Sequence, residues 1–222
     1  MSSVLGRRDV LLGLAAGLGL TGASLGALLY RILAHRDALR YALGEPGPTV
    51  NAEFPPLSSG APRPTLEQGD GPFYVPRTPL RRDVRPAAHD GAGLVLQGRV
   101  LDARGNPVAG AVLDLWQADE RGRYDHHGYG FRGHQYTDAD GRWEWLSVRP
   151  REYTGLGAFR APHVHAKVQG LGTPMLSTVV YFPDEADANA RDDAFREELA
   201  LTLVGRVGSV HLARFDFVLG EA

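Results

Sequence analysis

The chain has 222 residues, of which 43% are hydrophobic and 23% are charged, so a packed core is expected. Its formal net charge of −2 gives no reason to expect a nucleic-acid partner. The sequence has no cysteine, which excludes disulfides, iron–sulfur clusters, thiolate zinc sites and cysteine nucleophiles, and leaves His, Tyr, Asp and Glu as metal ligands.

Residues 1–43 predict an export signal or a membrane-anchor helix. Arg7 and Arg8 precede an apolar, Gly- and Ala-rich stretch from Val10 to about Tyr30, which resembles a bacterial twin-arginine signal. The stretch is near the length that spans a bilayer, and no A-x-A cleavage site follows it. A removed signal and an uncleaved anchor therefore both stay open. We expect an exported bacterial protein on the periplasmic or extracellular side.

Residues 44–90 predict a linker that continues as an extended arm, because they are rich in Pro, Gly and Ser and show no sustained periodicity. Residues 91–222 predict an all-β domain. Short strand candidates alternate there with turn signals such as 102–107 and 138–141. The candidates are 94–101, 111–117, 142–148, 163–169, 176–182 and 210–219.

The regular strand spacing is typical of a β-sandwich of mostly antiparallel strands. Trp143 and Trp145 are two residues apart in one candidate strand, so they share a face. Helical character is expected only between residue 185 and about residue 203, where Ala194, Leu199 and Leu203 give a partial apolar spacing. We therefore expect one short helix beside the sandwich.

The pair His163 and His165 is the strongest chemical signal of the chain. Residues i and i+2 of a strand project from one face, so both imidazoles can bind one metal ion. Tyr124, Tyr153 and Arg160 precede the pair. Tyrosine oxygens together with histidine nitrogens favour a hard, oxidised ion such as ferric iron over zinc. Each residue taken alone is compatible with an ordinary structural role, and the combination is what indicates a metal site.

Several segments together resemble the intradiol ring-cleavage dioxygenases, which include catechol 1,2- and protocatechuate 3,4-dioxygenases. Residues 65–74 read T-L-E-Q-G-D-G-P-F-Y, like the arm of that family, and residues 114–119 with 122–124 read D-L-W-Q-A-D and G-R-Y. Residues 150–153 and 160–165 read P-R-E-Y and R-A-P-H-V-H, like its P-x-x-Y and R-x-x-H-x-H segments. The resemblance runs from about residue 65 to residue 192.

The resemblance implies a non-haem Fe(III) site with Tyr124, Tyr153, His163 and His165 as ligands. Tyr153 corresponds to the ligand that leaves when substrate binds, and Arg160 would lie beside the substrate ring. The implied reaction is cleavage of a catechol-type aromatic between its two hydroxyl-bearing carbons with O2, which gives a cis,cis-muconate-type product. A small aromatic diol and O2 are thus the expected partners.

Gly71, Pro72 and Phe73 of the arm are candidate substrate contacts, and so is Val179. The chain departs from the family at Val179, because the family often has Gln there in an L-x-T-Q-x-Y-F strand. A polar contact around the metal ligands is therefore expected to be missing. Asp70 replaces the usual Glu of the arm.

Two other readings stay open from the sequence. One is a non-catalytic, exported β-sandwich that binds carbohydrate or protein. The other is a copper or zinc enzyme in which His126, His127 or His134 joins the histidine pair, and Tyr129 lies in the same polar segment. The identity of the catechol and the oligomeric state, a homo-oligomer included, are also left open.

Overall fold

The structure is a computed structural model that describes residues 62–87, 89–155 and 157–221. The expected signal or anchor and the first part of the 44–90 segment lie outside these described residues. Within them, no helix combines the length and the apolar character needed to cross a membrane.

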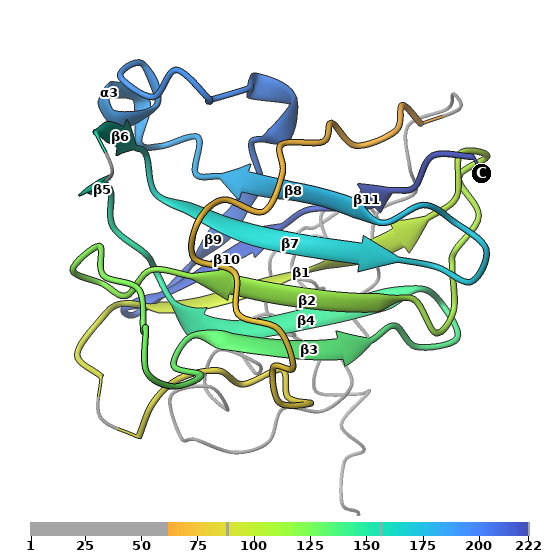
Figure 1. Ribbon diagram of the computed structural model, residues 1–222, viewed down its shortest axis with the longest axis horizontal. Coiled ribbons are helices and arrows are strands. Elements are labelled where there is room, and N and C mark those ends of the chain that lie inside the picture. The colour runs from red at the N-terminus through yellow and green to blue at the C-terminus, as the bar shows by residue number, and fades with distance from the viewer. Residues whose placement is uncertain (1–61, 88, 156, 222) are drawn as a thin grey trace, which may run out of the picture.

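Two β-sheets pack face to face, and the first has the strand order β3-β2-β7-β8 with antiparallel pairing throughout (Figure 1). Its strands are β2 Val112–Gln117, β3 Arg132–Tyr136, β7 His163–Gln169 and β8 Leu176–Tyr181. A separate hairpin pairs β5 Tyr153–Gly155 with β6 Ala158–Arg160 just before β7.

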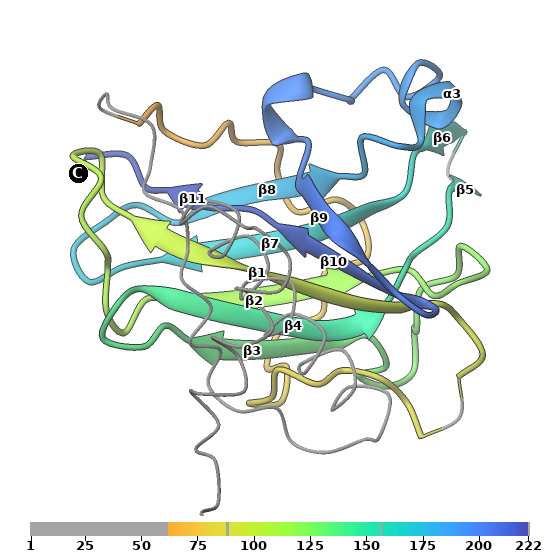
Figure 2. The same ribbon diagram turned by 180° about the vertical axis from the view of Figure 1, so that it is seen from behind.

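The second sheet has the order β11-β1-β10-β9, with β4 also paired to β1, and faces the viewer in Figure 2. Its strands are β1 Gly93–Leu101, β4 Arg142–Val148, β9 Thr202–Val207, β10 Val210–Arg214 and β11 Phe217–Val218. Only the pairs of β1 with β10 and with β11 are parallel among the described strands. The predicted, mostly antiparallel sandwich is confirmed.

Alternate residues of the two sheets fill the core between them. Trp143 and Trp145 of β4 are both buried there, as their spacing predicts. From the other sheet, β7 contributes Val164 and Ala166, which are fully buried. Because side chains alternate along a strand, the residues of β7 between them point to the opposite, outer face of the sheet. That outer face is where the histidine pair lies.

The strand register arranges the outer face of the β3-β2-β7-β8 sheet in rows. One row is Val179, His165, Trp116 and Arg132, and the next is Ser177, Lys167, Asp114 and His134. Residues 65–81, called the arm below, cross this face in front of β8, β7 and β2 (Figure 1). The arm is bonded to the sheet at both ends: Gln68 N–H donates to Ser177 O, and His134 N–H donates to Pro79 O.

The expected short helix between residues 185 and 203 is confirmed, but it is confined to a single turn. The structure has a single helical turn, α3 Ala186–Asn189, and a 3-10 turn at Glu197–Leu199. Between the two turns, the carboxylate of Asp192 accepts the N–H groups of Ala161 and Ala194, which diverts the chain from a continuous helix. Such local side-chain bonds compete with helical ones. The turn α3 lies beside the β5–β6 hairpin (Figure 1), and the 3-10 turn contacts β8.

The predicted strands at 142–148 and 163–169 are confirmed as β4 and β7, and the others are confirmed with small shifts. The candidate at 210–219 is interrupted at Phe215, whose carbonyl oxygen would lie 1.6 Å from a Cβ on Gly98. Only glycine allows this approach of the two backbones. The strands β3, β5, β6 and β9 were not predicted.

Candidate metal centre

Two imidazoles and a phenol converge on the outer face of β7. The Nε2 atoms of His163 and His165 are 3.1 Å apart, and the hydroxyl of Tyr124 lies 3.2 Å from His163 Nε2. All three side chains are buried. Neighbouring ligands bound at about 2.1 Å to one ion lie roughly 3 Å apart, so this spacing fits a shared metal ion.

Neighbouring groups fix both imidazole rings. His163 Nδ1 lies 2.6 Å from the carbonyl oxygen of Ala161, to which it can donate, and this bond leaves the Nε2 lone pair facing the site. The ring of His165 stacks on Trp116 with a centroid separation of 4.8 Å and an interplanar angle of 2°. On its edge, His165 Cε1 would lie 3.0 Å from a Cβ on Gly71, so the arm closes directly onto the ring.

Burial keeps both imidazoles neutral. It lowers the pKa of His163 to about 4 and the pKa of His165 well below its ordinary value, and the positive charge of Arg160 acts in the same direction. Neutral imidazoles keep the lone pairs that bind metal ions.

Tyr124 follows a tight turn at Gly122, where a Cβ would lie 2.2 Å from the carbonyl oxygen of Glu152. Its ring stacks on Phe73 of the arm with centroids 4.5 Å apart. Burial raises the pKa of Tyr124 well above its ordinary value, so the isolated side chain is a neutral phenol. A highly charged cation is the partner that would hold this oxygen as phenolate.

Tyr153 and Arg160 are paired across the β5–β6 hairpin. The ring of Tyr153 stands edge-on to Tyr124, with centroids 5.6 Å apart, and its centroid lies 6.1 Å from that of His163. Burial raises the pKa of Tyr153, and the nearby positive charge of Arg160 opposes this rise. The structure therefore places Tyr153 at the rim of the site, as the cross-strand neighbour of Arg160.

A buried network holds Arg160. Its Nε donates to Asp192 Oδ2 at 3.1 Å and its Nη2 donates to the hydroxyl of Tyr181 at 2.9 Å. Tyr181 donates in turn to Gln68 Oε1 of the arm at 3.0 Å. The side chain of Asp192 is 1% exposed. Sequence reasoning missed Asp192, because no motif marks it and it lies 32 residues after Arg160.

The predicted substrate contacts are not equivalent in space. Gly71 and Phe73 face His165 and Tyr124, whereas Pro72 between them is exposed. Val179 is 1% exposed and packs in an apolar cluster with Ala161, Tyr181 and Leu199. It is the cross-strand neighbour of His165, so it lies beside that ligand on the outer face of the sheet.

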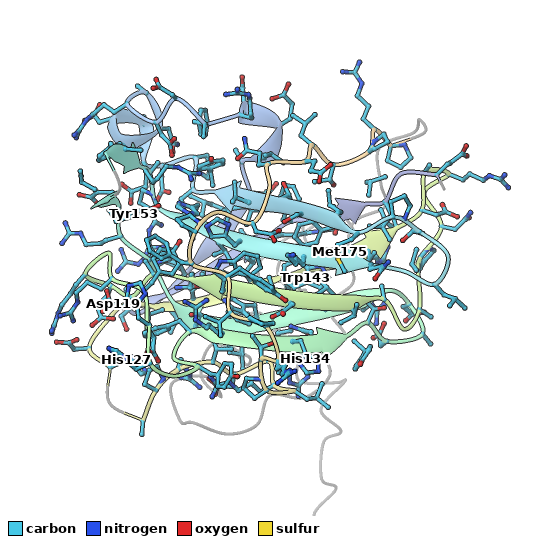
Figure 3. All side chains as sticks on the ribbon, in the orientation of Figure 1. Asp119, His127, His134, Trp143, Tyr153 and Met175 are labelled. Atoms are coloured by element: carbon cyan, nitrogen blue, oxygen red, sulfur yellow. The ribbon has the colours of Figure 1, made fainter. Side chains whose placement is uncertain are left out.

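The remaining histidines of the polar segment have other contacts. His134 Nδ1 lies 2.8 Å from the carbonyl oxygen of Thr78, and the ring of His126 packs edge-on against Phe73 at 5.3 Å. His127 is exposed, at the same end of the sandwich as Tyr153 (Figure 3). Tyr129 lies against the arm, with its hydroxyl 3.5 Å from Pro76 O. Within the described part of the chain, no group of three His, Asp or Glu side chains is arranged to hold a metal.

A cavity of about 740 Å³ adjoins the site through Tyr124, the one candidate ligand in its lining. Its walls are loops before β1 and around residues 119–131, with charges of both signs: Pro86, His89, Asp90, Asp119, Glu120, Arg121, Arg123, Tyr124, Asp125, Gly130 and Phe131. Gly71 and Phe73 of the arm, by contrast, lie directly against the candidate ligands His165 and Tyr124.

Comparison with known proteins agrees with this geometry. A family described as Dioxygenase matches residues 69–220, more than half of the chain. The hydroxyquinol 1,2-dioxygenase of Rhizobium sp. is 32% identical over 149 residues, which cover 56% of this chain and 49% of that protein. The catechol 1,2-dioxygenase 1 of Acinetobacter lwoffii is 31% identical over 185 residues, covering 70% and 57% respectively. The chain thus spans about half the length of these curated relatives.

Solved structures show the same similarity. The dioxygenase domain of a dioxygenase–carbohydrate-binding fusion from Streptomyces sp. SirexAA-E is 38% identical, with a TM-score of 0.66 over 72% of this chain and 100% of that domain. The 3-chlorocatechol 1,2-dioxygenase of Rhodococcus opacus is 26% identical, with a TM-score of 0.65 over 71% of this chain and 73% of that one.

Proposed function

Because the chain belongs to the intradiol ring-cleavage dioxygenase family, we propose that it is a non-haem Fe(III) enzyme that cleaves a catechol-type aromatic with O2. The bond between the two hydroxyl-bearing carbons breaks and both oxygen atoms enter the product, a cis,cis-muconate-type diacid. The observation that carries the proposal is the convergence of three candidate ligands: His163 Nε2 lies 3.2 Å from the hydroxyl of Tyr124 and 3.1 Å from Nε2 of His165.

Tyr124, Tyr153, His163 and His165 are the residues that would hold the iron. The donor set fits, because two phenolates are hard anionic ligands that offset the charge of a trivalent ion in a buried place, and the imidazoles are neutral. Ferric iron bound there supplies Lewis acidity towards the two diol oxygens and the redox chemistry that makes the ring reactive towards O2.

The chain itself supplies a base and a fixed cation. Tyr153 lies at the rim, and bound iron would hold its side chain as phenolate, so its oxygen could then take up one proton from an incoming diol hydroxyl. Arg160 cannot lose its charge, and as the cross-strand neighbour of Tyr153 it stands beside that tyrosine in the β5–β6 hairpin. The same guanidinium can stabilise negative charge that develops on the ring.

The arm covers the candidate metal centre and would shield the reacting diol from water. Gly71 leaves room against His165, and Phe73 covers Tyr124 with an aromatic face. An aromatic diol of one ring suits such a wall, because offset and edge-on ring contacts add to apolar burial. We propose that export by the twin-arginine-like segment places this enzyme outside the cytoplasm, as a free or anchored protein.

The test is oxygen uptake by the iron-loaded protein with a panel of catechols, including hydroxyquinol and chlorinated catechols. One O2 should be consumed per diol, and isotopically labelled O2 should deliver both atoms to a ring-opened diacid. Incorporation of a single oxygen atom, or no O2 uptake with any diol by protein that holds its iron, would contradict the proposal.

A further inference from the structure

A row of polar side chains crosses the outer face of the sheet beside the candidate metal centre. Ser177 of β8, Lys167 of β7, Asp114 of β2 and His134 of β3 are direct cross-strand neighbours. Lys167 is the only lysine of the sequence. It lies two residues after His165 on the same face of β7, about 7 Å further along the strand.

The arm contacts this row with every fourth residue. At one end, the carboxylate of Asp70 pairs with Lys167 Nζ at 2.6 Å and accepts a hydrogen bond from the hydroxyl of Ser177. Burial would raise the pKa of Asp70, but Lys167 and Ser177 together hold it below its ordinary value. Lys167 Nζ also stands 4.3 Å above the ring of Tyr74, the next arm residue in the series.

The contacts continue across the other two strands. Asp114 accepts the hydroxyls of Tyr74 at 3.1 Å and Thr78 at 2.8 Å. His134 Nδ1 lies 2.8 Å from the carbonyl oxygen of Thr78. Lys167 therefore stands between two carboxylates, one on the arm and one on the sheet, and it is the cation that joins the arm to the row.

The residues between these anchors are the ones that reach the metal centre. Gly71 and Phe73 lie between Asp70 and Tyr74 in the chain, and they contact His165 and Tyr124 respectively. A displacement of Asp70 therefore also displaces Gly71 and Phe73, the arm residues that cover the candidate ligands. The backbone bonds of Gln68 and Gly69 to Ser177 O lie at the same point of the arm.

We propose that Asp70, Lys167 and Ser177 form a latch that holds the arm over the metal centre, with Lys167 as a positioning residue for the diol pocket. The latch itself stands on these contacts alone, and its effect on the diol rests on the proposed function. Three interactions stabilise the closed arm: the partly buried ion pair of Asp70 with Lys167, the charge-assisted hydrogen bond from Ser177, and the cation–π contact of Lys167 with Tyr74. None of them involves a candidate metal ligand.

The first test is hydrogen exchange of the full chain in Lys167→Met and in Asp70→Asn. Exchange in the peptide that covers residues 65–75 should accelerate about tenfold, which corresponds to about 1.4 kcal/mol. Lys167→Arg should restore most of the protection. The matched control is Arg214→Met, which breaks a pair of equal length, Arg214 Nη2 to Asp216 Oδ2 at 2.6 Å, on the other sheet. Unchanged exchange of the arm in both latch variants would overturn the latch.

The second test is ring cleavage by the iron-loaded variants. In Lys167→Met the KM for the diol should rise roughly tenfold while kcat changes by less than about threefold, because the latch shapes the pocket and touches no reacting atom. Arg214→Met should leave both constants unchanged. Faster hydrogen exchange in the arm together with an unchanged KM would overturn the positioning role of Lys167. If the wild type cleaves no diol, the proposed function fails on its own, and the exchange result still decides whether the latch exists.

Discussion

The guanidinium of Arg160 donates through Nε to Oδ2 of Asp192 at 3.1 Å, and the side chain of this carboxylate is 1% exposed. The same Oδ2 accepts the N–H of Ala161, the residue whose carbonyl oxygen orients His163. Asp192 thus links the guanidinium of Arg160 to the start of β7, the strand that carries both histidines. A buried carboxylate with these partners fixes the position of Arg160 more firmly than a surface pair would.

Asp192→Asn should lower kcat/KM for the diol by about tenfold to a hundredfold, because Arg160 loses its fixed anionic partner. Iron content should stay at the wild-type level, since no proposed ligand is changed. Steady-state kinetics and metal analysis check this result. Asp193→Asn is the matched control, because Asp193 is adjacent but exposed. Equal kinetics in the two variants would show that Asp192 has no positioning role.

Gly71→Ala should impair the site more than Gly69→Ala. Both glycines have a positive φ, +66° and +74°, so both substitutions carry a similar backbone cost of about 1 kcal/mol. Only the Cβ at residue 71 meets His165 Cε1, at 3.0 Å, whereas nothing lies within 4 Å of a Cβ at residue 69. The two variants should therefore unfold at similar temperatures, but Gly71→Ala should retain less iron than Gly69→Ala. A Gly71→Ala protein with normal iron retention and kinetics would contradict the close contact.

Val179→Gln should destabilise the protein by about 1 to 3 kcal/mol and should not increase its activity. The side chain is enclosed by Ala161, Tyr181 and Leu199, so an introduced amide would be buried among apolar groups. Urea unfolding measures the loss, with Val179→Met as an apolar control of similar length. A rise in kcat with unchanged stability would instead show that this position reaches the pocket.

The stability that Asp70 adds should be lost only in acid. Its folded pKa is held below the ordinary value, so its contribution is complete above the unfolded value of 3.8 and disappears as the pH falls through the lower folded value. The difference in unfolding free energy between wild type and Asp70→Asn should be constant from about pH 8 to pH 5 and should shrink below about pH 4. A difference that shrinks near neutral pH would contradict the ion pair with Lys167.

Much of this site could be predicted from the sequence because its chemistry is local. The spacing of His163 and His165 predicts their shared face, and β7 has the predicted bounds. The alternation of Trp143 and Trp145 likewise predicts β4. These strands carry an uninterrupted pattern of residues, and each pattern depends only on neighbours in the chain.

The remainder depends on contacts between distant segments. β3 escaped prediction because its buried side chains are polar: Gln135 bonds to the backbone of Glu144, and Arg132 donates to carbonyl oxygens of the arm and of the loop before β3. Asp192 is invisible for the same reason, since only the folded chain brings it to Arg160. The helical pattern near residue 199 reflects burial of Leu199 against Val179 and Tyr181, not a continuous helix.

The two kinds of ligand should respond differently to substitution. His163→Ala and His165→Ala should each lose iron, because both imidazoles face the same point from one strand. Tyr153→Phe should keep iron but lose ring cleavage, since Tyr153 lies at the rim beside Arg160. Metal analysis of the purified variants beside wild type distinguishes these outcomes. Loss of iron from Tyr153→Phe alone would reverse the assigned roles.

The most direct measurement is the visible absorption spectrum of the purified protein, together with its metal content, during anaerobic titration with a catechol. We expect stoichiometric iron, a coloured protein with a phenolate-to-iron charge-transfer band, and a change of that band when the diol binds. The band should persist in altered form in Tyr153→Phe. A colourless protein that carries stoichiometric zinc, or an iron band that no catechol changes, would contradict the account.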